Sequence, residues 1–140
     1  SMDYMQPMLR DMARDGRQYV ICGDWNIAHR KIDIKNWRGN QKNSGFLPEE
    51  RAWMSELFGD VGWVDAFRVV EQGEHQYTWW SNRGQAWANN TGWRIDYHGA
   101  TPKLATTARS VEIYKTERFS DHAPLVIDYD FEFPGGGSGA

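Results

Sequence analysis

Short apolar runs, separated by clusters of Gly and Asn, constrain the fold of this chain most strongly. Such runs are typical of β-strands, and the clusters between them are typical of turns. The run at residues 18–22 predicts a buried strand that is followed directly by polar residues. Further strands are expected at residues 76–80, 94–97, 110–114 and 125–131.

Two segments have helical signals instead. Apolar residues recur at helical spacing over residues 3–15, which predicts an amphipathic helix that ends near Gly16. The segment that begins at Pro48 has Pro and two acids in its first turn, a typical helix start, and predicts a helix to about Gly59. Strands with inserted helices predict an α/β fold.

Composition bounds the chain more loosely. Its 140 residues suffice for one domain or part of one, and eight Trp residues argue against disorder. The single cysteine, Cys22, excludes an internal disulfide and fits a reducing compartment, so we expect a cytoplasmic location. No apolar run approaches the roughly 18 residues of a membrane span, so we expect no membrane contact. The formal net charge of −3 does not by itself indicate nucleic-acid binding.

The ends of the chain have a different character from its middle. Residues 1–2 read as a remnant of tag cleavage, and residues 134–140 read as a flexible Gly/Ser linker. We therefore expect the folded part to be residues 3–133.

Asp24 and Asn26 follow the first predicted strand, where α/β sheets commonly build their sites. A carboxylate there can take a proton, and an amide can stabilise an oxyanion without adding charge. Both residues are also common turn formers. The polar loop that follows carries three Asn side chains with two cations and no acid over residues 36–43, which suits phosphate contacts. A merely solvated loop is the alternative.

Adjacent Trp79 and Trp80 would face opposite sides of a strand, so we expect one side chain in the core and the other in a groove. A Trp side chain in a groove could stack on bases. His122 requires an orienting carboxylate if it acts on a phosphate or a proton, and the candidates are Asp96 and Asp121. The alternative for the Trp residues is packing in the core. The alternative for the Asp–His pair is capping of the strand that follows it. No second His or Cys stands at zinc-ligand spacing.

Six motifs stand in order along the chain: GDWNIAH at 23–29, IDIKN at 32–36, GNQKNSGFLPEER at 39–51, YTWW at 77–80, GWRIDY at 92–97 and SDHAPL at 120–125. Together they resemble the exonuclease III family of apurinic/apyrimidinic endonucleases, most closely its proteobacterial branch, over about residues 3–133. The resemblance is to the C-terminal half of the family. It implies half of a four-layered α/β sandwich: a mixed β-sheet with helices on one face and a partner half over the other.

The resemblance also implies roles for individual residues. Asp24 would activate water or assist the leaving oxygen, Asn26 would stabilise the phosphate and its nucleophile, and His122 would donate to the scissile phosphate. Asp96 would orient His122, and Asp121 would lie near a Mg²⁺ or Mn²⁺ ion. That metal site is expected to be incomplete and weak, because the Glu ligand belongs to the N-terminal half. The remaining implied roles are contacts to double-stranded DNA at an abasic site, by Asn36, Asn40, Asn43, Arg51, Trp79 and Trp93.

The sequence leaves three classes of function open. One hypothesis is half of a Mg²⁺-dependent abasic-site endonuclease and 3′→5′ exodeoxyribonuclease, inactive or strongly impaired in isolation. The second is an engineered or excised half-domain that acts as an assembly module, forming a homodimer or complementing another half. A third is a DNA-binding module without chemistry.

Overall fold

The computed structural model describes residues 2–132, so the expected linker at 134–140 and the first residue of the expected tag remnant lie outside the described residues. The elements follow in the order α1 (Met2–Arg14), β1 (Val20–Asp24), the 3₁₀ turns η1 (Lys31–Asp33) and η2 (Arg38–Asn40), α2 (Pro48–Leu57), β2 (Val64–Asp65), α3 (Ala66–Val70), β3 (Trp79–Trp80), β4 (Gly92–Trp93), β5 (Asp96–Ala100), α4 (Pro102–Ala105), β6 (Ala108–Ile113) and β7 (Leu125–Tyr129).

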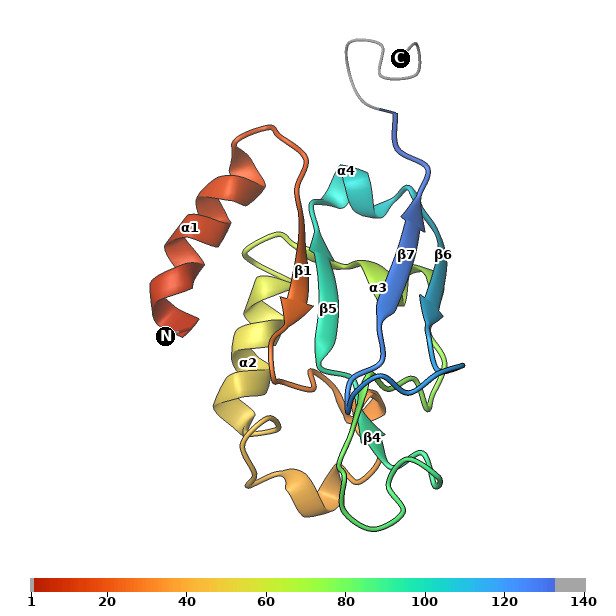
Figure 1. Cartoon of the computed structure of the whole chain (residues 1–140). Coiled ribbons are helices and arrows are strands. Elements are labelled where there is room, and N and C mark those ends of the chain that lie inside the picture. Colours follow the sequence, from red (N-terminus) through yellow and green to blue (C-terminus); the bar gives the residue numbers. More distant parts are fainter. Residues whose placement is uncertain (1, 133–140) are drawn as a thin grey trace.

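The strands form three small sheets, in the orders β1-β5-β2, β3-β4 and β6-β7. In Figure 1 the β1–β5 pair and the β7–β6 pair stand side by side, and α1 and α2 lie beside β1. The α/β class is therefore confirmed. The resemblance implied a mixed β-sheet, whereas every strand pair within residues 2–132 is antiparallel.

One face of β1 packs against the two long helices. Ile21 is half-buried against a cluster that contains Leu9 of α1, Leu57 of α2 and Trp63. The alternate residues of the strand point the other way: Val20 is 42% exposed and Cys22 is exposed. The predicted strand is therefore present, but the prediction that it is buried was wrong. A run of apolar residues indicates a strand, but β1 is an edge strand and only one of its faces is covered in this chain.

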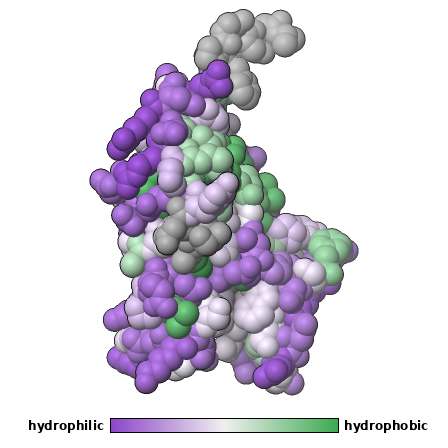
Figure 2. Space-filling view, turned by 90° about the vertical axis from the view of Figure 1, so that its left-hand side faces the viewer, coloured by the Kyte–Doolittle hydropathy of each residue, from purple (hydrophilic) through white to green (hydrophobic). Residues whose placement is uncertain are grey.

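Helix α1 is amphipathic, as predicted, but little of its apolar side is buried. Leu9 is 2% exposed, whereas Tyr4, Met5 and Met8 are exposed. Figure 2 shows this side of the molecule, where hydrophilic side chains cover much of the surface and a hydrophobic area lies in the upper half.

A second core lies under β6 and β7, where α3 and α4 contribute Phe67 and Leu104 against Ile127. The strand expected at 76–80 is reduced to β3, and the one expected at 94–97 becomes β4 and β5 with a break between them. The break arises because the Arg94 N–H donates to the Asp33 carbonyl, and the Ile95 carbonyl accepts from Trp25. Both groups leave the ladder at this point, so residues 94–95 connect the two small sheets.

Candidate active site

Two carboxylates meet at the ends of β1 and β5. The strands are antiparallel, and their register places Asp24 directly opposite Asp96. Side chains of directly opposed residues lie on the same face of a sheet, here the face away from Ile21 and the helices. Asp24 and Asp96 therefore share the uncovered face of the sheet, as the resemblance requires of residues acting on one substrate.

His122 reaches the two carboxylates from a distant part of the chain. Its segment pairs with β3, since Trp80 N–H donates to the Asp121 carbonyl at 3.1 Å and Ala123 N–H donates to the Thr78 carbonyl at 2.8 Å. His122 Nδ1 then lies 2.9 Å from Asp96 Oδ2. Because a carboxylate accepts, this contact places a proton on Nδ1. His122 Nε2 faces Asp24 Oδ2 at 3.5 Å.

The pKa values of His122 and Asp96 are both shifted by their surroundings. Burial alone would lower the pKa of His122, but the hydrogen bond and charge of Asp96, with the charges of Asp24 and Asp121, raise this pKa above its ordinary value. Burial raises the pKa of Asp96 above its usual value, against the opposing effect of its hydrogen bonds to His122 and Thr78. The pair can therefore hold or release a proton at the rim of the site.

Asn26 turns the chain out of β1. Its φ angle of 56° is in the left-handed region, which Asn tolerates better than most residues. Its N–H donates to Asp24 Oδ1 at 2.9 Å, so the turn also fixes the carboxylate. The alternative that these residues are turn formers is thus correct as geometry. It does not compete with a functional role, because the exposed Asn26 side chain lines the cavity beside His122.

That cavity, of about 370 Å³, has two aromatic walls. Trp79 and Trp93 are cross-strand partners on β3 and β4, with ring centroids 6.0 Å apart and planes at 87°. Trp79 is half-buried and Trp80 is 1% exposed, which confirms the prediction of one Trp in a groove and one in the core. Gly45 keeps the cavity open: its φ is +99°, and a Cβ there would lie 2.7 Å from the Trp93 ring.

Asp121, the residue expected near a metal, uses its carboxylate differently. Its Oδ2 accepts a hydrogen bond from the Trp79 indole at 3.0 Å. Within residues 2–132, the side chains that could hold a metal together are Asp24, Asp96 and His122, whose ligand atoms lie within 4.8 Å of one another. Mg²⁺ prefers oxygen ligands and commonly takes one or two carboxylates with phosphate and water. The two Asp side chains fit this preference, and the imidazole does not.

Besides Trp79 and Trp93, the expected DNA contacts lie on one loop and on α2. Asn40 Nδ2 donates to the Asn36 carbonyl at 2.8 Å, and Asn43 Nδ2 donates to Asn40 Oδ1 at 2.9 Å. Arg51 lies on α2, where its Nε donates to the Phe46 carbonyl at 3.2 Å and its guanidinium stands over the Phe46 ring. These contacts stiffen the loop beside the cavity, and each amide nitrogen still carries a second N–H.

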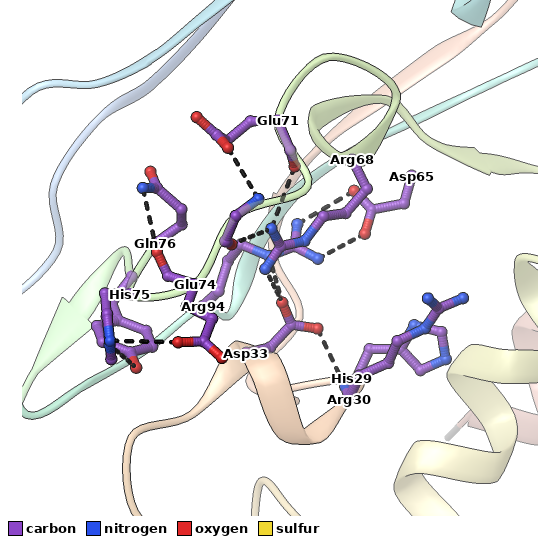
Figure 3. A network of polar contacts seen from close by, with 12 residues as sticks. His29, Arg30, Asp33, Asp65, Arg68, Glu71, Glu74, His75, Gln76 and Arg94 are labelled. Atoms are coloured by element: carbon purple, nitrogen blue, oxygen red, sulfur yellow. Dashed lines mark hydrogen bonds and ion pairs between the residues drawn. The ribbon is translucent and has the colours of Figure 1, made fainter.

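A buried ionic network is centred on Asp33 and Arg94 (Figure 3). Asp33 Oδ1 accepts from Arg94 Nε at 2.8 Å and from Arg68 at 2.7 Å, and Asp65 accepts two hydrogen bonds from Arg94. The Arg94 cation and its hydrogen bonds overcome burial and keep the pKa of Asp33 below its ordinary value. The network joins η1, at the start of the Asn loop, to the segment between Trp93 and Asp96.

Sequence reasoning missed two residues that shape the site. Thr78 is fully buried, and its hydroxyl accepts from the N–H groups of Ile95 and Asp96 at 3.1 Å each. Gly45 lies in the motif at residues 39–51, and the sequence predicted no separate role for it. The available signals were a hydroxyl residue between aromatic residues and a Gly in a polar loop.

Comparison with known proteins identifies the family of this chain. A model of the Endonuclease/Exonuclease/phosphatase family matches residues 9–122, and the chain belongs to this family. The zebrafish DNA repair nuclease APEX1 is 39% identical over 109 residues, which are 77% of this chain and 35% of that protein.

Two solved structures are similar over 93% of this chain. They are the 3′-5′ exonuclease NExo of Neisseria meningitidis (TM-score 0.85, 28% identity) and an AP endonuclease of Archaeoglobus fulgidus (TM-score 0.82, 25% identity). The matches cover 52% and 53% of those chains, so this chain spans about half their length and forms half of their sandwich. Within residues 2–132, no helix is long and apolar enough to cross a membrane.

Proposed function

We propose that this chain is the half of a DNA-repair phosphodiesterase that carries the Asp–His machinery and the substrate pocket. Its substrate would be double-stranded DNA with abasic sites or recessed 3′ ends. The observation that carries the proposal is the cluster of Asp24, Asp96 and His122, whose histidine lines a cavity walled by Trp79 and Trp93. The family match and the names of the similar nucleases support the same chemistry.

Each residue has a role that its contacts permit. His122, charged through Asp96, would donate to a phosphate oxygen as negative charge develops on it. Asp24, which is exposed at the strand end, would orient or deprotonate the attacking water. Asn26 would contact the same phosphate with its amide. The aromatic walls would accept an extruded sugar without a base and exclude one that carries a base.

Asp24 and Asp96 would hold a Mg²⁺ or Mn²⁺ ion together with the substrate phosphate. Such an ion polarises the phosphodiester. Because Asp96 also serves His122, and Asp121 bonds to Trp79, we expect metal binding by this chain to be weak. The 140-residue chain should therefore cleave abasic DNA several orders of magnitude more slowly than a full-length relative, since loss of part of a catalytic unit is strongly non-additive.

The test is nicking of a duplex with one stable abasic site, with Mg²⁺ or with EDTA, by the chain and by His122→Asn. We expect slow, Mg²⁺-dependent nicking that His122→Asn abolishes, with Lys103→Gln on α4 as a control that retains it. A rate near that of a full-length relative would contradict the impaired half-site. Nicking that survives in His122→Asn would contradict the assignment of the site.

We also propose that the uncovered face of the β1–β5 sheet binds a second polypeptide, either another copy of this chain or a complementing half. Val20 is 42% exposed on this face, and Cys22, His98, Leu125 and the exposed Phe119 line a groove along it. An apolar face of a sheet is normally covered. In the similar solved structures, about as much chain again accompanies the part matched here.

Light scattering over a dilution series tests this second proposal. A dimer that dissociates on dilution is expected, and Val20→Asp should shift it to monomer. Val69→Asp is the matched control, because Val69 is equally exposed but lies on α3. A monomer at every concentration that gains no mass or activity on addition of an N-terminal half from a relative would refute the proposal.

A further inference from the structure

One stretch of this chain is rich in positive charge. Residues 30–43 carry five cations and a single acid, in a chain whose net charge is −3. The acid, Asp33, is fully buried and paired with Arg94 and Arg68. The cations are all exposed and have no ion-pair partner among residues 2–132; they are Arg30, Lys31, Lys35, Arg38 and Lys42. The exposed surface of this stretch is therefore strongly positive.

Two of these cations are held in place by one indole ring. Lys31 Nζ lies 4.0 Å from the centroid of the Trp37 ring, and the Arg38 guanidinium carbon lies 4.6 Å from it. Trp37 is itself anchored, because it packs against the core cluster that contains Ile34 and Phe46. Flexible surface cations lose side-chain entropy when they bind an anion, and a cation already ordered on an aromatic ring loses less.

The segment that carries Lys31, Trp37 and Arg38 is connected through its backbone to Trp93, one wall of the cavity. Ile34 forms a bridge with Trp93, and the Lys35 N–H donates to the Gly92 carbonyl at 3.1 Å. The backbone between Lys31 and Arg38 is thus bound to β4, which carries the aromatic wall. A DNA strand with one nucleotide at the cavity would have its neighbouring phosphates beside this positive stretch.

We propose that Lys31, Trp37 and Arg38 form a clamp for the sugar-phosphate backbone of duplex DNA. This inference rests on the proposed function and adds to it a set of cations, ordered by Trp37, that the Asn and Arg51 contacts do not include. The clamp recognises phosphate and not sequence, since contacts to phosphate carry no sequence information. The clamp sets the affinity for duplex DNA and the salt dependence of that affinity, and the cavity selects the abasic site.

Affinity measured at several salt concentrations tests the clamp. The probe is a fluorescent duplex without an abasic site, in EDTA so that no cleavage occurs. Each neutralised phosphate contributes about 0.9 to the slope of log K against log salt. Lys31→Gln and Arg38→Gln should each reduce the slope by about 1, and Lys103→Gln on α4, at the opposite end of the molecule in Figure 1, should leave it unchanged.

Trp37→Leu separates ordering from charge. It keeps an apolar side chain in the core and both cations, so the slope should stay nearly constant while affinity falls about three- to ten-fold. Circular dichroism establishes that each variant is folded. Duplex binding by the unaltered chain with the same slope in Lys31→Gln, Arg38→Gln and the control would overturn the clamp alone. Absence of salt-dependent binding by the unaltered chain would overturn the clamp and count against the proposed function as well.

Discussion

Two clusters of carboxylates and cationic side chains each include a residue of the 92–96 segment, and they differ in their exposure to water. In the network, the Asp33 and Arg94 side chains are each 1% exposed, and Arg94 is bonded to two carboxylates. In the site, the side chains of Asp24, Asp96 and His122 are 37%, 19% and 32% exposed. The first cluster has little contact with solvent, whereas the second faces the space where a substrate would bind.

The difference follows from the cost of burying charge. A buried ion must be paired and hydrogen-bonded on every side, and among residues 2–132 no buried side-chain nitrogen or oxygen is without a partner. Burial alone would raise the pKa of Asp33, but the Arg94 and Arg68 cations and their hydrogen bonds keep this pKa below its ordinary value. The site cluster is only partly desolvated, and against the effect of burial the hydrogen bond and charge of Asp96 raise the pKa of His122. Similar residue types therefore serve as a fixed support in one place and as a reactive group in the other.

The largest effect that would test this comparison is on stability. Asp33→Asn removes one charge from the buried network and leaves Arg94 and Arg68 undercompensated, so we expect the free energy of unfolding to fall by about 3–5 kcal/mol. Urea denaturation measures this fall. Asp24→Asn, the matched substitution in the site, should change the same quantity by less than about 0.5 kcal/mol. Equal effects of the two substitutions would remove the distinction between the clusters.

A second substitution affects the boundary between the clusters. Thr78→Val keeps the shape of the side chain but leaves the N–H groups of Ile95 and Asp96 without their acceptor. The expected loss of unfolding free energy is about 1–3 kcal/mol, measured by the same denaturation. Thr78→Ser restores the hydroxyl and should recover most of it. If Thr78→Val were as stable as the unaltered chain, the hydroxyl would not be what holds the Asp96 backbone.

The third effect is smaller and concerns pH. The pKa of His122 is raised in the folded state, so its contribution to stability is complete below about pH 6.5 and is lost as pH rises through the folded pKa. The pKa of Asp33 is lowered, so its contribution is complete above about pH 4 and is lost only as pH falls further. From about pH 5 to 8, the stability difference between the unaltered chain and His122→Asn should shrink. The difference to Asp33→Asn should stay constant. The opposite pattern in urea midpoints would contradict the account.

The same contrast explains what could be predicted from the sequence. Asp24 and Asn26 were predictable because they follow an apolar run directly, and Trp79 and Trp80 because strand alternation separates neighbours. The network was not predictable, since Asp33 and Arg94 are 61 residues apart and nothing local marks them as partners. The apolar run of β1 predicted a buried strand, because apolar residues indicate a strand and do not reveal what covers it; that one face lacks a cover within this chain was implied only by the resemblance.

The measurement that tests the central claim most directly is the titration of His122 by NMR, in the unaltered chain and in Asp96→Asn, with EDTA present. The account predicts a pKa above the ordinary value of about 6.5 in the unaltered chain, because Asp96 bonds to Nδ1 and outweighs burial. In Asp96→Asn the pKa should fall, since burial then acts without the opposing charge. An ordinary pKa that is the same in both proteins would show that Asp96 and His122 do not act as a pair.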